Sequence, residues 1–143
     1  MRISEIMTRD PQVLPSDSVL RDAAAKMREL DIGMLPISKD DRLVGMLTDR
    51  DITVRATAEG RDPSKTKVSE VMTPEVLYCF DDQEVSEAAK IMQDKQIRRL
   101  PILNREKRLV GIVSLGDVAV QSNEQKTVSN TIKEVSEPAE PNR

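Results

Sequence analysis

The sequence predicts an α/β (α+β) protein built from two tandem repeats, each ordered strand-helix-strand-strand-helix and packed together with pseudo-twofold symmetry. Residues 4–8 recur as residues 69–73, an offset of 65 positions, and residues 35–37 recur with the same offset. A corner motif centred on a glycine recurs after 66 positions, at Gly45 and at Gly111. Because several unrelated landmarks keep nearly one spacing, we interpret the chain as a duplication.

Short apolar runs rich in Val, Ile and Leu predict the strands. In chain order they lie around residues 12–15, 32–37 and 43–48 of the first repeat, and 75–80, 97–103 and 109–114 of the second. Charged turns, at 38–42 and 104–108, precede the last strand of each repeat. The middle strand of each repeat contains a proline, which favours an edge position or a strand end because proline cannot donate a ladder hydrogen bond.

Apolar residues with i, i+3, i+4, i+7 spacing predict one amphipathic helix in each repeat. These residues are Leu20, Ala23, Ala24 and Met27 in the first repeat, and Val85, Ala88, Ala89 and Met92 in the second. Asp17 or Ser18 is expected to cap the first helix, and Asp81 with Glu84 the second. Closing helices are expected over residues 49–59 and 115–122.

These elements give a domain organisation of two repeats and a tail. The first repeat is expected over residues 1–59, a linker over 60–67, the second repeat over 68–122 and a C-terminal tail over 123–143. The tail has a helical pattern around residues 127–135 and is polar from Ser136, so its end is expected to be loose.

Composition excludes several classes of function. The chain has 22 Lys and Arg against 25 Asp and Glu, a net charge of −3, which argues against nucleic-acid binding through a broad basic face. One cysteine and no histidine remove most zinc sites and acyl-transfer triads. No apolar run approaches the ~20 residues that span a bilayer, and residues 1–10 lack a signal-peptide pattern, so we expect a cytoplasmic protein.

The two corners are the candidate functional elements. In each, a buried strand ends at a hydroxyl residue that is followed three positions later by an aspartate: Thr48 with Asp51, and Ser114 with Asp117. This spacing is typical of a strand that leads into a helix, and a helix N-terminus presents N–H groups that suit an anion. The same residues also fit a capping box, which is a purely structural role. Both interpretations stay open.

These features together resemble the cystathionine-beta-synthase (CBS) domain family. The matching residues are the entries Met7-Thr8 and Met72-Thr73, the strands with Leu35-Pro36 and Leu100-Pro101, and the two Gly-x-x-Thr/Ser-x-x-Asp corners. The resemblance covers nearly all of residues 1–122, as the pair of CBS repeats called a Bateman module. The short chain and its Asp49-Arg50-Asp51 corner look like small stand-alone bacterial CBS proteins, some of which are induced by hypoxia or other stress.

The resemblance implies a regulatory protein rather than an enzyme, which forms a disc-shaped homodimer. It implies an adenosine nucleotide (AMP, ADP or ATP, or sometimes NAD or S-adenosylmethionine) bound as a regulatory ligand in the cleft between the repeats, with no required cofactor or metal. Because no catalytic or transport domain is attached, its output is expected to act in trans on a protein target that the sequence does not identify. The alternative is a ligand-free structural or protein-interaction protein.

The resemblance also assigns site residues. Asp51 and Asp117 correspond to carboxylates that accept hydrogen bonds from ribose hydroxyls, and Thr48 and Ser114 to hydroxyls that hold ribose or phosphate. The remaining site residues lie at the start of the middle strands: Ile32, Gly33, Met34 and Ile97 would flank adenine, and Arg98 and Arg99 would contact phosphate.

In related modules the strands of one repeat complete the corner of the other, so Ser114 and Asp117 would complete the set around Ile32. Since the second repeat has arginines where the first has Gly33 and Met34, the two sites cannot be chemically equal. The ligand is expected to prefer the cleft closed by Ser114, Asp117 and the arginine pair. The alternative for Arg98 and Arg99 is a solvated strand edge.

Overall fold

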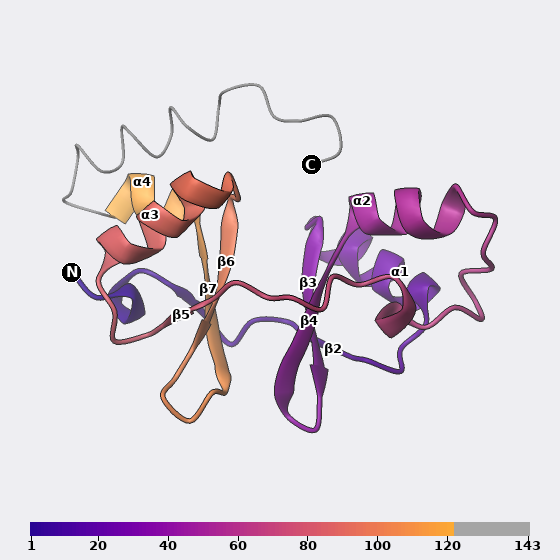
Figure 1. The fold of residues 1–143 in the computed structure, drawn as a ribbon, viewed down its shortest axis with the longest axis horizontal. Coiled ribbons are helices and arrows are strands. Elements are labelled where there is room, and N and C mark those ends of the chain that lie inside the picture. The colour runs from indigo at the N-terminus through magenta and orange to yellow at the C-terminus, as the bar shows by residue number, and fades with distance from the viewer. Residues whose placement is uncertain (122–143) are drawn as a thin grey trace. The chain divides into compact units, whose positions relative to one another are not determined.

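The computed structural model describes residues 1–121, which form two compact units (Figure 1). One unit is Gln12–Val76, and the other combines Met1–Pro11 with the chain from Leu77 onward. The predicted helical turns around 127–135 and the loose end from Ser136 lie outside the described residues. No helix within residues 1–121 is long and apolar enough to cross a membrane.

The Gln12–Val76 unit has the predicted order of strand, helix, strand, strand and helix. Its three-stranded sheet has the order β2-β3-β4, in which β2 (Leu14–Pro15) is parallel to β3 (Met34–Lys39), and β3 is antiparallel to β4 (Arg42–Thr48). The helices are α1 (Leu20–Leu30), α2 (Asp49–Asp51) continued by the π-helical η2 (Ile52–Thr57), and the short 3-10 helix η3 (Val68–Glu70).

The other unit repeats this order with β5 (Cys79–Phe80), α3 (Val85–Lys95), β6 (Arg99–Leu103), β7 (Leu109–Ser114) and α4 (Leu115–Gln121). Two pieces from the start of the chain join it, the 3-10 helix η1 (Ile3–Glu5) and β1 (Thr8–Arg9). The strand order is β1-β7-β6-β5. Figure 1 shows α3 and α4 together beside the β6–β7 pair. The predicted α/β class and element order are confirmed.

Each Met-Thr entry pairs with the corner strand of the other sequence repeat. Thr8 pairs with Ile112 of β7, and Thr73 forms a bridge with Met46 of β4. The corner glycines permit this approach: a Cβ at Gly111 would lie 2.6 Å from Met7 Sδ and 2.9 Å from the carbonyl oxygen of Thr8. The repeated glycine of the corner and the repeated methionine of the entry are therefore two halves of one contact.

The prolines of the middle strands do not mark edges, so that expectation is wrong. Pro36 lies in β3, between β2 and β4, and Pro101 lies in β6, between β5 and β7. Pro36 faces Met46, whose N–H and carbonyl both bond to Thr73 (2.9 Å each), so β4 offers Pro36 no hydrogen bond. The pairing of the two-residue β2 begins only at Ile37, so no ladder bond is lost at Pro36.

The side-chain caps predicted for α1 are wrong, whereas of the two residues predicted for α3 Glu84 is the N-cap and Asp81 is not. The N-cap of α1 is Val19, and the N–H groups of the first turn donate to backbone carbonyls instead: Leu20 to Thr66 (2.9 Å) and Arg21 to Pro63 (3.0 Å). The N-cap of α3 is Glu84, without a contribution from Asp81, and its N–H donates to Glu87 Oε2 at 2.9 Å. Carbonyls supplied by residues 60–67 take the place of the aspartate or serine expected at α1.

The two hairpins differ by one residue, which explains why the sequence offset changes from 65 to 66. The β3–β4 turn has two central residues in the left-handed region, Asp40 (φ 51°) and Asp41 (φ 67°). The longer β6–β7 turn closes with an Asn104 N–H bond to the Arg108 carbonyl (2.9 Å), and Lys107 has φ 61°. The insertion lies in the turn, so the strands keep equivalent registers on either side of it.

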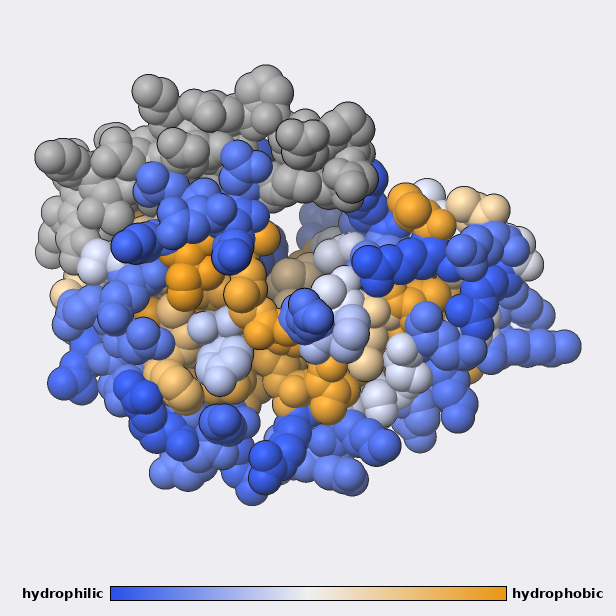
Figure 2. Space-filling model, viewed as in Figure 1, coloured by the Kyte–Doolittle hydropathy of each residue, from blue (hydrophilic) through white to orange (hydrophobic). Residues whose placement is uncertain are grey.

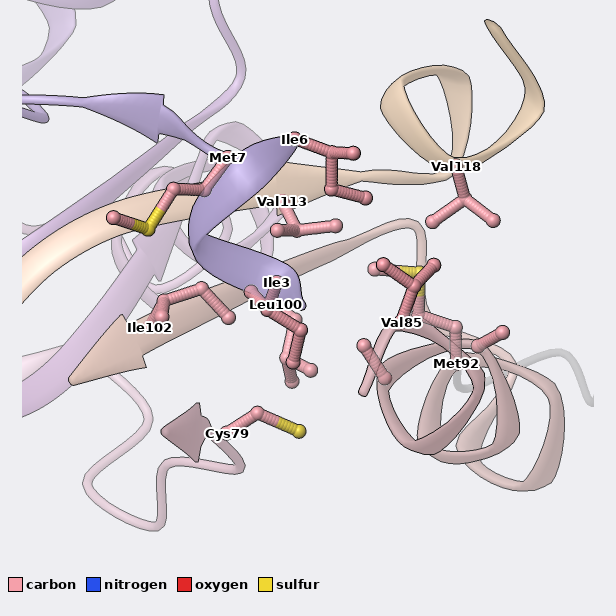
Figure 3. Packing of buried hydrophobic residues seen from close by; sticks show 12 residues of the cluster. Ile3, Ile6, Met7, Cys79, Val85, Met92, Leu100, Ile102, Val113 and Val118 are labelled. Atoms are coloured by element: carbon pink, nitrogen blue, oxygen red, sulfur yellow. The ribbon is translucent and has the colours of Figure 1, made fainter. Parts of the chain in front are cut away.

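Each unit has its own hydrophobic core. In the unit with β5–β7, residues from η1, the middle strands and α3 pack together, as Figure 3 shows for Ile3, Leu100 and Met92. The other core gathers buried residues of α1, β3, β4 and the segment around η3: Leu20, Ala23, Met27, Leu35, Ile37, Leu47, Val68 and Val71. Hydrophilic residues cover most of the coloured surface visible in Figure 2.

Candidate functional site

The first corner is built by β4, α2 and a reciprocal pair of hydrogen bonds. The N–H of Asp51 donates to Thr48 Oγ1 (3.0 Å), and the N–H of Thr48 donates to Asp51 Oδ2 (2.9 Å). The other oxygen, Asp51 Oδ1, lies 3.9 Å from Nε of Arg55. The capping box is thus present, and a cation faces the second carboxylate oxygen.

The second corner has the same cap without that cation. The N–H of Asp117 donates to Ser114 Oγ (3.0 Å), and the N–H of Ser114 donates to Asp117 Oδ2 (2.9 Å). Within residues 1–121, Oδ1 of Asp117 has no hydrogen-bond partner. Capping therefore uses one carboxylate oxygen of Asp117 and leaves the other able to accept a hydrogen bond from a ligand.

The N–H groups of the corners are less available than the sequence suggests. At the first corner the N–H groups of Asp49, Arg50 and Asp51 all have acceptors, which are the Gly33 carbonyl (2.9 Å), Asp49 Oδ1 (2.8 Å) and Thr48 Oγ1 (3.0 Å). At the second corner Leu115 donates to the Arg98 carbonyl (2.8 Å) and Asp117 to Ser114, while the N–H of Gly116 has no acceptor within residues 1–121. Anion binding through free N–H groups is thus excluded at the first corner.

The predicted strand residues lie beside the corner of their own repeat. Met34 pairs with Thr48 in the β3–β4 ladder, and Arg99 pairs with Ser114 in the β6–β7 ladder. Gly33 and Arg98 follow the same pattern, since their carbonyls accept the N–H groups of Asp49 and Leu115. The structure therefore brings Gly33, Met34, Thr48 and Asp51 together in one unit, and Arg98, Arg99, Ser114 and Asp117 in the other. That strands of one repeat complete the corner of the other stays a prediction.

A hollow of about 470 Å³ opens at the second corner. It is lined by residues of β6, β7 and α4: Arg98, Arg99, Ser114, Leu115, Gly116 and Ala119. Both arginine side chains are exposed, and neither has an ion-pair partner within residues 1–121. Two guanidinium groups next to a serine hydroxyl form a surface on which phosphate oxygens can be bound bidentately.

The first corner has a different set of charged residues, which are Asp49, Arg50, Asp51 and Arg55. Asp49 is exposed at its rim, and a Cβ on Gly33 would lie only 2.9 Å from Asp49 Oδ2. Arg55 is shared between two groups, because its Nε faces Asp51 while its Nη1 donates to the carbonyls of Val71 (3.2 Å) and Met72 (3.3 Å). The Asp49 carboxylate thus lies beside the strand entry, which in the other repeat consists of two arginines.

Ile32 and Ile97, predicted to flank adenine, are half-buried and pack against the core of their own units. Each follows the C-cap of a helix, and its N–H donates back to that helix, Ile32 to Met27 (3.0 Å) and Ile97 to Met92 (3.1 Å). Their packing gives them a structural role, and contact with adenine stays a prediction.

Sequence reasoning missed Asp49, Leu115, Gly116 and Ala119. Asp49 and Leu115 occupy the same position of the repeat, directly after the hydroxyl residue, and this difference in charge was visible in the sequence. The hollow itself was not, because it depends on how α4 packs against β6 and β7. No group of three or more His, Cys, Asp or Glu side chains within residues 1–121 is placed to hold a metal ion.

Comparison with known proteins decides the family. The family model for the CBS domain matches residues 3–56 and 68–122. This chain belongs to the CBS domain family. The two matches correspond to the two sequence repeats, so the chain is a CBS pair.

Similar proteins include other short CBS proteins. The CBS domain-containing protein YhcV of Bacillus subtilis is 37% identical over 134 residues, which cover 94% of each chain. Hypoxic response protein 1 of Mycobacterium tuberculosis is 40% identical over 116 residues, 80% of each chain. Among solved structures, the CBS domain pair of protein MJ0100, in complex with 5′-methylthioadenosine and S-adenosyl-L-methionine, has a TM-score of 0.73 and 28% identity; the match covers 83% of this chain and 93% of that one.

Proposed function

We propose that this CBS pair is a regulatory module that binds an adenosine nucleotide (AMP, ADP or ATP, with NAD and S-adenosylmethionine as further candidates) and signals to a protein partner in trans. The observation that carries the proposal is the second corner. There, Ser114 and the guanidinium groups of Arg98 and Arg99, which have no ion-pair partner within residues 1–121, line one hollow, and Asp117 caps the helix that begins beside it. These groups match the phosphate and ribose of one nucleotide.

The comparisons support this proposal. The MJ0100 pair was solved with two adenosine compounds, which is the ligand class proposed here. The likeness to Hypoxic response protein 1 supports a role in a stress response. The proposed protein acts as a homodimer and performs no catalysis, since a regulatory ligand needs only to favour one conformation over another.

The mechanism that we propose is linkage. Arg98 precedes β6 and Arg99 begins it, while Ser114 ends β7 and Asp117 lies in the first turn of α4. A nucleotide that contacts all four holds the end of the hairpin and the start of α4 in one arrangement. The ligand then stabilises that arrangement by its differential affinity, and a partner that recognises α4 or the hairpin senses the ligand.

A thermal-shift panel tests the proposal. With ligand at about 100 times its dissociation constant, binding should add about 2.7 kcal/mol of stability, which raises the melting temperature by several degrees. The panel contains AMP, ADP, ATP, NAD and S-adenosylmethionine. If none of them changes the melting temperature, the chain is the ligand-free interaction protein, an alternative that the satisfied capping boxes at both corners favour.

Asp117→Asn separates ligand binding from capping. An asparagine keeps the oxygen that accepts the Ser114 N–H, but it replaces the free carboxylate oxygen by an NH₂ donor. We expect nucleotide affinity to fall at least several-fold with little change in melting temperature. Ser114→Ala is the matched variant that breaks the cap. Unchanged affinity in Asp117→Asn would assign Asp117 to capping alone.

A further inference from the structure

The two corners share one backbone design and differ in charge at four equivalent positions, one of which has Arg50 in the first corner and Gly116 in the second. The residue after the hydroxyl is Asp49 in the first corner and Leu115 in the second. The strand entry is Gly33-Met34 in the first and Arg98-Arg99 in the second. Equivalent positions therefore place a carboxylate in one corner and two guanidinium groups in the other.

The differences at positions 33 and 49 depend on each other sterically. Oδ1 of Asp49 accepts the N–H of Arg50 (2.8 Å), which fixes the carboxylate against the strand entry. Its Oδ2 then lies 2.9 Å from where a Cβ of residue 33 would be, and its Cγ lies 3.2 Å from that point. A side chain at position 33 would therefore force the Asp49 carboxylate to move from its place beside the strand entry.

The same carboxylate makes the first corner unfavourable for phosphate. Asp49 uses the N–H of Arg50 that a phosphate would need, and the neighbouring N–H groups are bonded to Gly33 and Thr48. Nη1 of Arg55, a cation of this corner, donates to the carbonyls of Val71 and Met72. A phosphate there would face the carboxylates of Asp49 and Asp51 without a free backbone N–H group of residues 49–51, and like charges at such range repel.

At the second corner the corresponding groups favour phosphate. Leu115 leaves the N–H of Gly116 unbonded within residues 1–121, and it places no charge beside Arg98. Arg98 and Arg99 line the 470 Å³ hollow together with Ser114. The strand entry of the second corner is therefore positively charged, whereas the strand entry of the first corner has the Asp49 carboxylate beside it.

We propose that the pair Gly33 and Asp49, and the pair Arg98 and Leu115, determine which corner accepts the phosphates of an adenosine ligand. The second corner takes the phosphate-bearing nucleotide, and the first corner excludes it. This inference rests on the proposed function and adds to it a selectivity between the two corners of one chain. ATP accordingly binds once per chain, through the arginine pair.

Isothermal titration calorimetry with ATP and with 5′-methylthioadenosine tests the inference. The second compound has the adenosyl group without phosphate. Arg98→Gly with Arg99→Met gives the second corner the strand entry of the first; we expect ATP affinity to fall at least ten-fold and that of 5′-methylthioadenosine to change less than two-fold. Lys107→Asn is the control, since it removes a positive charge at the opposite end of the same hairpin, from a left-handed position that asparagine tolerates.

The reciprocal change tests the first corner. Gly33→Arg with Asp49→Leu removes the steric conflict and gives the first corner the residues of the second, so the number of ATP molecules bound per chain should rise from one toward two. Gly33→Arg alone should not raise it, because Asp49 remains. Circular dichroism and the melting temperature establish that each variant is folded.

The outcomes separate this inference from the proposed function. If neither ATP, 5′-methylthioadenosine nor any other compound of the thermal-shift panel binds the wild-type chain, the proposed function fails and the selectivity with it. If ATP binds twice per wild-type chain, or binds equally well after Arg98→Gly with Arg99→Met, only the selectivity fails. An unchanged ATP stoichiometry in a folded Gly33→Arg, Asp49→Leu variant also overturns it.

Discussion

At the scale of single residues, the corner aspartates have two separable tasks. Oδ2 of Asp51 and of Asp117 closes a capping box, so each aspartate is accounted for structurally. The remaining oxygen distinguishes them: that of Asp51 faces Arg55 at 3.9 Å, whereas that of Asp117 has no partner within residues 1–121. A ligand therefore meets less competition at Asp117, which agrees with the arginine pair lying in the same unit.

Cys79 provides a pH-dependent prediction at this scale. Its side chain is 1% exposed, and burial, aided by the charge of Glu87, raises the pKa of the thiol from 9.0 to about 11. The folded state then binds the proton more tightly than the unfolded state. The stability from this group is fully present below pH 9 and is lost as the pH rises toward 11, by about 3 kcal/mol in total.

Urea unfolding of wild type and Cys79→Ala between pH 8 and about 11 measures this effect. The wild type should lose stability relative to the variant across that range, on top of a constant difference from the smaller side chain. If the two proteins show parallel pH profiles, the thiol is not the group responsible.

At the scale of elements, periodic patterns predicted the long pieces and failed where distant segments meet. The i, i+3, i+4, i+7 spacing located α1 and α3, because each buries one face on its own sheet. The capping of α1 was missed because its acceptors are the carbonyls of Pro63 and Thr66, far away in the sequence. The central position of Pro36 was missed because it depends on how short β2 is.

The site was predictable to a similar degree. The repeated corners and the arginine pair were visible in the sequence, and the Arg99–Ser114 register follows from the hairpin. The effect of Asp49 was missed, since it depends on the short distance of 2.9 Å between Asp49 Oδ2 and the point where a Cβ of residue 33 would lie. Short-range sterics of this kind have no periodic signature in a sequence.

The glycine of the second corner gives a prediction for an element contact. In Gly111→Ala the new Cβ would lie 2.6 Å from Met7 Sδ and 2.9 Å from the backbone oxygen of Thr8. The sulfur can move, but the backbone of β1 cannot move without breaking its pairing with β7. Overpacking of this kind costs about 1–3 kcal/mol. Gly60→Ala is the comparison, since its Cβ would meet no atom within 4 Å and only its φ of 71° opposes the change.

Chemical denaturation of the two variants decides the point. Gly111→Ala should be the less stable, and Met7→Ala added to it should recover part of the loss, because the clash with sulfur disappears. Equal stability of Gly111→Ala and wild type would show that β1 does not press on β7 as described.

At the scale of the whole molecule, the compact units do not coincide with the sequence repeats. Residues 1–11 precede the first repeat's sheet, yet Ile3 (0% exposed), Ile6 (3%) and Met7 (8%) belong to the core with β6 and β7. The chain therefore runs from one unit into the other and back, so the second repeat depends on the first residues of the chain.

Removal of residues 1–11 tests this dependence. The loss of three buried side chains, each contributing about 1.5–3 kcal/mol, approaches the whole stability of a typical domain. Hydrogen exchange should show loss of protection across residues 77–121 and retained protection across residues 12–76. Asp10→Asn, an exposed change in the same segment, should leave both residue ranges protected. Uniform loss of protection, or none, would contradict the division into units.

The central claim is that a nucleotide binds at the second corner, and an NMR titration of the ¹⁵N-labelled chain with ATP tests it most directly. We predict saturable shifts of the backbone amides of Arg99, Ser114, Gly116 and Asp117, with the Arg98 and Arg99 side-chain Nε–H signals shifting in parallel. The account is contradicted if ATP leaves these signals unchanged, or if the saturable shifts lie at residues away from this corner.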